Sequence, residues 1–200
     1  MTVPLALYQT TPRWLAVFWL SFGATLALEY WISARDRATA RGEYKDRGSI
    51  FIVVAMVWLG LFAAYFAPYV ARWARIALPP APMFWSAIAL IWAGIALRIW
   101  SVLTLGKFYR LQVFILAGHQ LVTSGPYRLV RHPSYAGGLL TVTGIGLAMG
   151  NWLSVAVAFL CLFVGYAMRI VIEEQALRAH FGTAFEAYKR HTWALIPLLW

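Results

Sequence analysis

Five long apolar segments dominate the chain and restrict what it can fold into. They cover residues 14–32, 49–70, 83–105, 135–150 and 152–172. A helix of about 20 apolar residues crosses the roughly 30 Å hydrocarbon core of a bilayer. Only 12% of the 200 residues are charged, whereas soluble domains carry about 25%. The sequence therefore predicts an all-α fold, a polytopic membrane protein with five transmembrane helices.

The last two apolar segments are separated by one residue, Asn151. We therefore expect the fourth and fifth helices to form a tight helical hairpin. The fourth segment, 135–150, is short and rich in glycine. Small residues let membrane helices approach one another closely, so we expect this helix to pack tightly against its neighbours.

Basic residues are distributed unevenly between the two ends of the predicted helices. Connections 33–48 and 106–134 and the tail after residue 172 carry twelve Lys and Arg, and the opposite side carries three. The positive-inside rule then predicts an N-terminus outside and a C-terminus in the cytoplasm. The net charge of +10 is scattered among apolar runs, which fits anionic lipid headgroups. We expect membrane lipids, and no nucleic acid, as partners.

The tail after the last apolar segment also looks ordered. Residues 173–181 and 184–191 predict two short helices that are broken at Gly182, and no segment convincingly predicts a strand. The tail helices carry four apolar side chains, Leu177, Phe181, Phe185 and Tyr188. Such side chains suit a surface that is half sunk in the membrane interface.

Polar chemistry concentrates in two clusters that the predicted topology brings to one face. The first is GHQLVTSGPYRLVRHPSY, residues 118–135, and the second is RIVIEEQAL, residues 169–177. In the second cluster Arg169 and Glu173 share a helical face at i and i+4. Ionisable groups at the mouth of a membrane helix suggest a small-molecule pocket. The plainer alternative is that Glu173 only neutralises Arg169 and that Arg128 and Arg131 are positive-inside anchors.

Two more charges lie within apolar segments. We expect Arg98 to snorkel to the cytoplasmic interface, and Glu29 to pair with Arg35 or to lie in the interface. No metal site is expected, because the sequence has one cysteine and no HxxxH or CxxC pattern. A Ser-His-Asp hydrolase is also unsupported, since no Asp follows residue 46.

The chain carries H-x-L-V, then G-P-Y, then R-H-P-S-Y-x-G, then R-x-x-x-E-E-x-x-L. This order resembles the isoprenylcysteine carboxyl methyltransferase family, integral-membrane enzymes that use S-adenosylmethionine. The resemblance runs from about residue 106 to 197. It implies that residues 1–200 are a single membrane-embedded methyltransferase domain. Residues 1–82 would hold two N-terminal spans, and 83–200 the catalytic core.

The resemblance also implies roles for individual residues. A cytoplasmic loop and the C-terminal interfacial helices would form the cofactor pocket, and Arg169 would face the acceptor as the catalytic residue. The residues expected to bind the cofactor are Gln112, His119, Gln120, Leu121, Val122, Tyr127, His132, Pro133, Ser134, Tyr135 and Glu173. An arginine suits a carboxylate acceptor because its planar fork can bind both oxygens.

The acceptor stays open at this point. The first hypothesis is carboxyl O-methylation of a lipophilic, isoprenylcysteine-like acid that enters from the lipid or is carried by a prenylated substrate. The alternatives are N- or S-methylation of a phospholipid amine or thiol, or a relative of the fold without methyltransferase activity. An amine would need a base to remove its proton, and the sequence suggests only Glu174 or a histidine.

Overall fold

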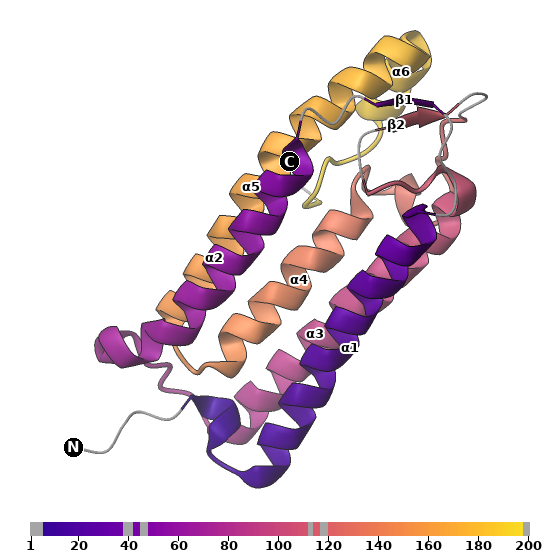
Figure 1. Ribbon diagram of the computed structural model, residues 1–200. Helices are drawn as coiled ribbons and strands as arrows, with labels where there is room; N and C mark the ends of the chain where they lie inside the picture. Colours follow the sequence, from indigo (N-terminus) through magenta and orange to yellow (C-terminus); the bar gives the residue numbers. More distant parts are fainter. Residues whose placement is uncertain (1–5, 38–41, 45–47, 112–113, 117–119, 198–200) are drawn as a thin grey trace.

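The computed structural model describes residues 6–37, 42–44, 48–111, 114–116 and 120–197. Within these residues the chain consists mainly of long helices that run side by side (Figure 1). Short 3-10 turns connect them, η1 (Leu7–Gln9), η2 (Arg72–Ala74), η3 (Gly106–Phe108) and η4 (Gly125–Arg128). The predicted all-α fold is confirmed.

Four helices in the described residues are long and apolar enough to cross a membrane. They are α1 (Pro12–Arg37), α2 (Ser49–Val70), α3 (Pro80–Leu105) and α5 (Trp152–Phe181). The remaining predicted span is α4 (Pro133–Ala148), which has 16 residues. At 1.5 Å per residue it is about 24 Å long, shorter than the roughly 30 Å of hydrocarbon. All five predicted helices are present, and the crossing by α4 stays a prediction.

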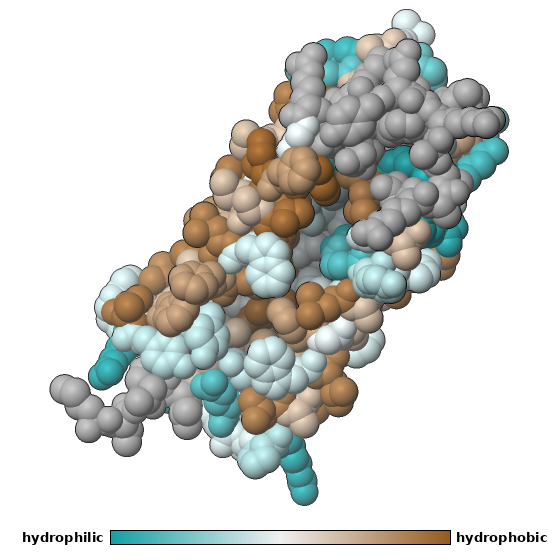
Figure 2. Space-filling model, in the orientation of Figure 1, coloured by the Kyte–Doolittle hydropathy of each residue, from teal (hydrophilic) through white to brown (hydrophobic). Residues whose placement is uncertain are grey.

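The outer surface of the long helices is apolar. Figure 2 shows brown, hydrophobic side chains along the helices and teal, hydrophilic ones mainly towards the two ends. Large side chains such as Leu20, Phe51 and Phe62 are exposed on α1 and α2. Contiguous exposed apolar surface of this extent is rare on soluble monomers, so these faces are suited to contact lipid.

The helices pack in the order α1, α3, α4, α5, α2. Helices α1 and α2 are therefore the two ends of the series, and α4 is seen in the space between them (Figure 1). Glycine allows the closest of these contacts. A Cβ atom on Gly94 of α3 would lie 2.4 Å from the carbonyl oxygen of Gly137 on α4. The expectation that α4 packs tightly is confirmed.

The turn between α4 and α5 is a compact hairpin. Gly150 adopts φ +72°, a left-handed conformation that favours glycine. Asn151 then caps α5, because its Oδ1 accepts a hydrogen bond from the Leu153 amide at 2.9 Å. Its Nδ2 donates to the Ala71 carbonyl at 2.8 Å, which ties the turn to the end of α2. The predicted hairpin is confirmed.

The tail differs from the prediction in one respect. Residues 173–181 are not a separate helix, because α5 continues without a break to Phe181. The break falls at Gly182, as predicted, with φ +54°. Helix α6 (Thr183–Arg190) follows it.

A small sheet joins two connections that are far apart in the sequence. Strand β1 (Gly42–Tyr44) pairs antiparallel with β2 (Phe114–Leu116). The expectation of no strand was wrong, since three-residue strands are too short to carry an alternating pattern. The sheet and α6 gather at one end of the bundle (Figure 1). The first connection, the third connection and the tail therefore share one end, as expected.

Candidate active site

A cleft opens at the end of the bundle that carries α6. It is lined by the third connection, the first turn of α4, the end of α5 and α6. Eight of the predicted cofactor residues line it, Gln120, Leu121, Val122, Tyr127, His132, Ser134, Tyr135 and Glu173. Pro133 is instead fully buried at the first position of α4, where its ring starts the helix. Gln112 and His119 lie outside the described residues.

Aromatic residues that the sequence did not assign to the site complete the cleft. Phe108, Tyr109, Phe181, Phe185 and Tyr188 line it together with Leu177. These include the four apolar side chains of the tail, so the C-terminal helices form part of the pocket, as expected. The apolar spacing within the tail was visible in the sequence, but the surface that it covers was not.

The Glu174 carboxylate holds the third connection, α5 and α6 together. It accepts hydrogen bonds from Arg131 Nε at 2.8 Å and from Lys189 Nζ at 2.6 Å. His132 Nε2 lies 3.5 Å from the same carboxylate. Arg131 also donates to the Thr192 carbonyl. Arg131 therefore clamps three segments together, a role that the plainer alternative did not include.

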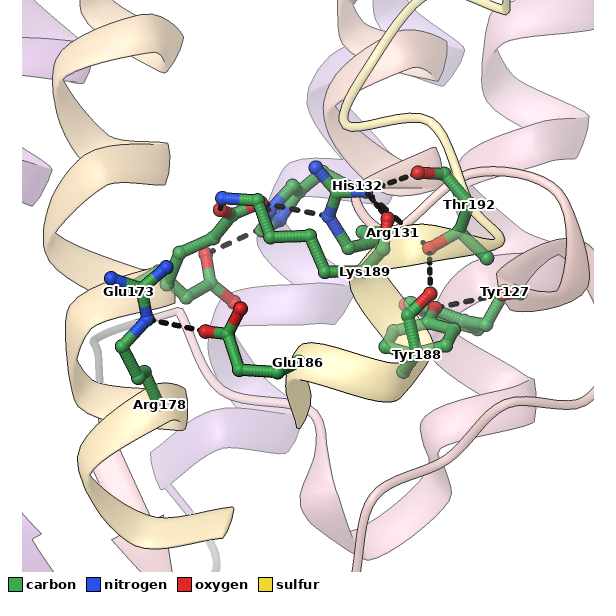
Figure 3. Close-up of polar contacts among 10 residues, drawn as sticks. Tyr127, Arg131, His132, Glu173, Arg178, Glu186, Tyr188, Lys189 and Thr192 are labelled. Carbon is green, nitrogen blue, oxygen red and sulfur yellow. Dashed lines mark hydrogen bonds and ion pairs between the residues drawn. The ribbon is translucent and has the colours of Figure 1, made fainter. Parts of the chain in front are cut away.

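Main-chain hydrogen bonds to the C-terminal tail also hold the third connection in place. The Arg131 amide donates to the Trp193 carbonyl at 2.8 Å, and the His132 amide donates to the Ala194 carbonyl at 3.0 Å. The Trp193 amide returns a bond to the Leu129 carbonyl at 3.0 Å. In addition, Tyr188 of α6 donates its hydroxyl to the Tyr127 carbonyl at 2.7 Å (Figure 3). The C-terminal tail thus sets the conformation of the residues that precede α4.

Tyr135 connects the two charged residues that the sequence placed on one helical face. Its hydroxyl accepts a hydrogen bond from Arg169 Nε at 2.8 Å and donates one to Glu173 Oε2 at 2.7 Å. Its ring stacks on Tyr166, with centroids 4.6 Å apart, and on His132, at 5.4 Å. Tyr135 therefore has little freedom to move, and it joins Arg169 to Glu173 through one oxygen atom.

Arg169 is buried, with 3% of its surface exposed. Besides Tyr135, its guanidinium donates to Ser49 Oγ at 2.9 Å at the start of α2, and to the Leu111 carbonyl. These contacts tie α5 to α2 and to the third connection. They fix the positive charge of Arg169 at a defined place inside the bundle.

A second cavity of about 370 Å³ lies among α1, α2, α4 and α5. Its walls are mainly apolar, including Leu26, Val54, Trp58, Val142, Ile145 and Leu162. Figure 2 shows a hollow, bordered by hydrophobic side chains, on the face between α1 and α2. Arg169 lines this apolar cavity and Glu173 lines the cleft, whereas Tyr109, Arg110 and Tyr135 line both. The two spaces therefore meet at Tyr135.

The apolar cavity also contains an ion pair that the sequence did not predict. Arg98 of α3 donates to both carboxylate oxygens of Glu29 on α1, at 3.0 Å for the Nη2–Oε2 bond. Arg35, the expected partner of Glu29, instead lies over the Trp31 ring at 5.5 Å. Arg98 pairs with Glu29 because the packing of α1 on α3 brings that carboxylate opposite it.

Comparison with known proteins gives consistent matches. A family model described as phospholipid methyltransferase matches residues 82–184. The protein-S-isoprenylcysteine O-methyltransferase of Schizosaccharomyces pombe is 33% identical over 111 residues, which cover 48% of this chain and 47% of that protein. A probable protein-S-isoprenylcysteine O-methyltransferase of Oryza sativa is 31% identical over 114 residues, which cover 56% of this chain and 60% of that protein.

A solved structure is also similar. It is the eukaryotic intramembrane Ras methyltransferase ICMT (isoprenylcysteine carboxyl methyltransferase), with a TM-score of 0.54 and 25% identity. The match covers 76% of this chain and 53% of that one. The chain thus spans about half to three fifths of the length of these proteins. With its apolar helices, this likeness identifies an integral membrane protein and confirms the resemblance that the order of motifs indicated.

Proposed function

The chain belongs to the phospholipid methyltransferase family, and we propose that it transfers a methyl group from S-adenosylmethionine to the carboxylate of a lipophilic, isoprenylcysteine-like acid. The observation that carries this proposal is that a cleft with charged and polar side chains meets an apolar cavity at Tyr135. A polar methyl donor and a lipid-like acceptor need separate entrances that converge on one point. Here the cleft opens beside α6 and the cavity lies between membrane helices.

The residues of the cleft fit S-adenosylmethionine, which supplies an electrophilic methyl group on a sulfonium when it is bound. The side chain of Glu173 is 31% exposed, and its carboxylate can accept from a ribose hydroxyl or an amino group. Phe108, Phe185 and Tyr188 line the cleft and offer aromatic surface for an adenine ring.

Arg169 would act on the acceptor. It lines the apolar cavity and its partners hold it beside Tyr135. A fixed positive charge in a low-dielectric surrounding attracts a carboxylate far more strongly than it would in water. The acceptor carboxylate would therefore be drawn to the wall that separates the cavity from the cleft, with its apolar chain among the helices.

A carboxylate acceptor also agrees with the position of Glu174, one of the bases that the sequence suggested for an amine acceptor. A carboxylate is already anionic, so the chain needs only to position it and to exclude water. Glu174, which the sequence suggested as a base for an amine, is held by Arg131 and Lys189. It lines neither the cleft nor the apolar cavity. Its position supports carboxyl methylation over amine methylation.

The test is to incubate the purified protein in lipid nanodiscs with deuterium-labelled S-adenosylmethionine and an S-farnesylcysteine derivative, alongside a total lipid extract. We expect label in a methyl ester, which mild base hydrolyses to methanol. Label found only in base-stable N-methyl or S-methyl products would show that the acceptor is an amine or a thiol and not a carboxylate. Protein that binds the cofactor but labels neither preparation would contradict the proposed activity.

A further inference from the structure

The Glu29–Arg98 pair lies in the wall of the apolar cavity, within two helices that are long enough to cross a membrane. The Glu29 side chain is 41% exposed and that of Arg98 is 12% exposed. Charged groups within membrane helices are costly, and they generally mark sites that bind or transfer something polar. The pair therefore needs an explanation beyond the packing of two helices.

Helix α1 is already attached to α3 without this pair. The rings of Trp14 and Phe84 stack with centroids 4.8 Å apart, and Trp92 Nε1 donates to Ser21 Oγ at 3.1 Å. An apolar pair of similar volume often replaces a buried ion pair without loss of stability, or with a gain. Helix attachment alone would thus be served as well by two apolar residues at positions 29 and 98.

The remaining hydrogen-bonding capacity of Glu29 indicates what the pair could do. An ionised carboxylate has about four lone-pair sites, and Arg98 uses one on each oxygen. Within the described residues, Arg98 alone donates to Glu29. Arg98 holds the carboxylate in place while leaving lone pairs that can accept from a donor in the cavity.

We propose that Glu29, held by Arg98, is a specificity subsite of the apolar cavity that binds an N–H donor next to the reacting carboxylate of the acceptor. The subsite rests on the proposed function, because it assumes that the acceptor occupies this cavity. It assigns to Glu29 the nitrogen that an isoprenylcysteine-like acid carries next to its carboxylate, and it predicts weaker binding of long-chain acids without an N–H group there. Arg169 and Glu29 line the same cavity and would bind the carboxylate and the N–H group respectively.

Two probes separate this subsite from general binding of lipophilic acids. One is N-acetyl-S-dodecylcysteine, and the other is the same molecule with the amide hydrogen replaced by a methyl group. Both carry one carboxylate and the same chain, and they differ at the proposed contact. We expect the wild-type protein in nanodiscs to bind the N–H probe about tenfold more tightly by calorimetry, as a hydrogen bond to a charged group implies.

The double variant Glu29→Leu with Arg98→Met removes both charged side chains, so neither charge is left without its partner. We expect it to bind the two probes equally, while the matched control, Arg178→Ala with Glu186→Ala, keeps the preference because that pair is exposed on α5 and α6. Glu29→Gln is measured as well, since it keeps the shape and should lose most of the preference. If the double variant does not fold, the Glu29→Gln variant decides whether Glu29 gives the preference for the N–H probe.

Equal binding of both probes by the wild-type protein, or binding of neither, would overturn the subsite. So would a preference that survives in the folded double variant or in Glu29→Gln. Turnover with labelled S-adenosylmethionine is measured separately. Selective binding of the N–H probe without ester formation would leave the subsite standing and contradict the proposed carboxyl methylation.

Discussion

The Tyr135 hydroxyl accepts a hydrogen bond from Arg169 Nε at 2.8 Å and donates its own proton to the Glu173 carboxylate, 2.7 Å away. One oxygen atom thus joins a residue of the apolar cavity to a residue of the cleft. Because both partners are charged, each bond is expected to be stronger than one between neutral groups. This arrangement allows the occupant of one space to affect the geometry of the other.

The Tyr135→Phe variant removes this oxygen and keeps the ring that stacks on Tyr166 and His132. We expect folded protein whose kcat/KM for the acceptor falls by an amount equivalent to about 1.5–3 kcal/mol, the range for a hydrogen bond to a charged group. Tyr30→Phe, on the exposed surface of α1, is the control. An unchanged kcat/KM would show that the Tyr135 hydroxyl does not position the reacting groups.

Glu173→Gln removes the negative charge from the cleft. We expect the affinity for S-adenosylmethionine to weaken by about 1.5–3 kcal/mol, since a charged acceptor is lost. Calorimetry on purified protein measures this, with Glu186→Gln, a more exposed carboxylate on α6, as the matched control. If the folded Glu173 variant bound the cofactor as the control does, Glu173 would not belong to the cofactor site.

Arg169→Lys and Arg169→Ala test the role of the cavity arginine. Lysine keeps the charge but not the planar fork, so we expect near-normal cofactor affinity and slower turnover. A misplaced acceptor can cost on the order of 100-fold in rate, and the alanine variant should be slower still. Near-normal turnover of both variants would reject a carboxylate role. Loss of cofactor affinity together with turnover would make Arg169 a structural partner of Tyr135.

The membrane orientation can be tested independently of chemistry. The third connection and the tail lie at one end of the bundle (Figure 1), and the basic residues predict that this end is cytoplasmic. Reporter fusions at the Asn151 turn and at the C-terminus should report opposite sides, with the C-terminus inside. A C-terminal reporter that is active only outside would place the proposed active site on the other side of the membrane.

Tyr188 predicts a dependence of stability on alkaline pH. Burial raises the pKa of its hydroxyl from 10.0 to about 12, so the folded protein holds this proton more tightly than the unfolded chain. The resulting stability is fully present below pH 10 and is lost as the pH rises from 10 to about 12. Thermal unfolding in detergent should show a smaller decrease over this range for Tyr188→Phe than for wild type. Equal decreases would exclude Tyr188 as a source of the effect.

Local signals in the sequence were sufficient to place the helices. The predicted segment 49–70 coincides with α2 (Ser49–Val70), and the hairpin falls at Asn151. Apolar runs, glycine and helix-capping residues act over a few neighbouring positions, so one chain suffices to recognise them. The order of polar motifs likewise indicated the family and about half of the residues that line the cleft.

Which charged side chains pair with one another was decided only by the tertiary structure. Glu29 and Arg98 are 69 residues apart in the sequence, and Arg131 and Glu174 are 43 apart. Their pairing depends on how whole helices sit against one another, which the close contact of Gly94 with α4 helps to fix. A charge inside an apolar segment could be recognised from the sequence, but its partner could not. The partner is set by the relative positions of rigid helices, and those positions follow from packing across the entire bundle.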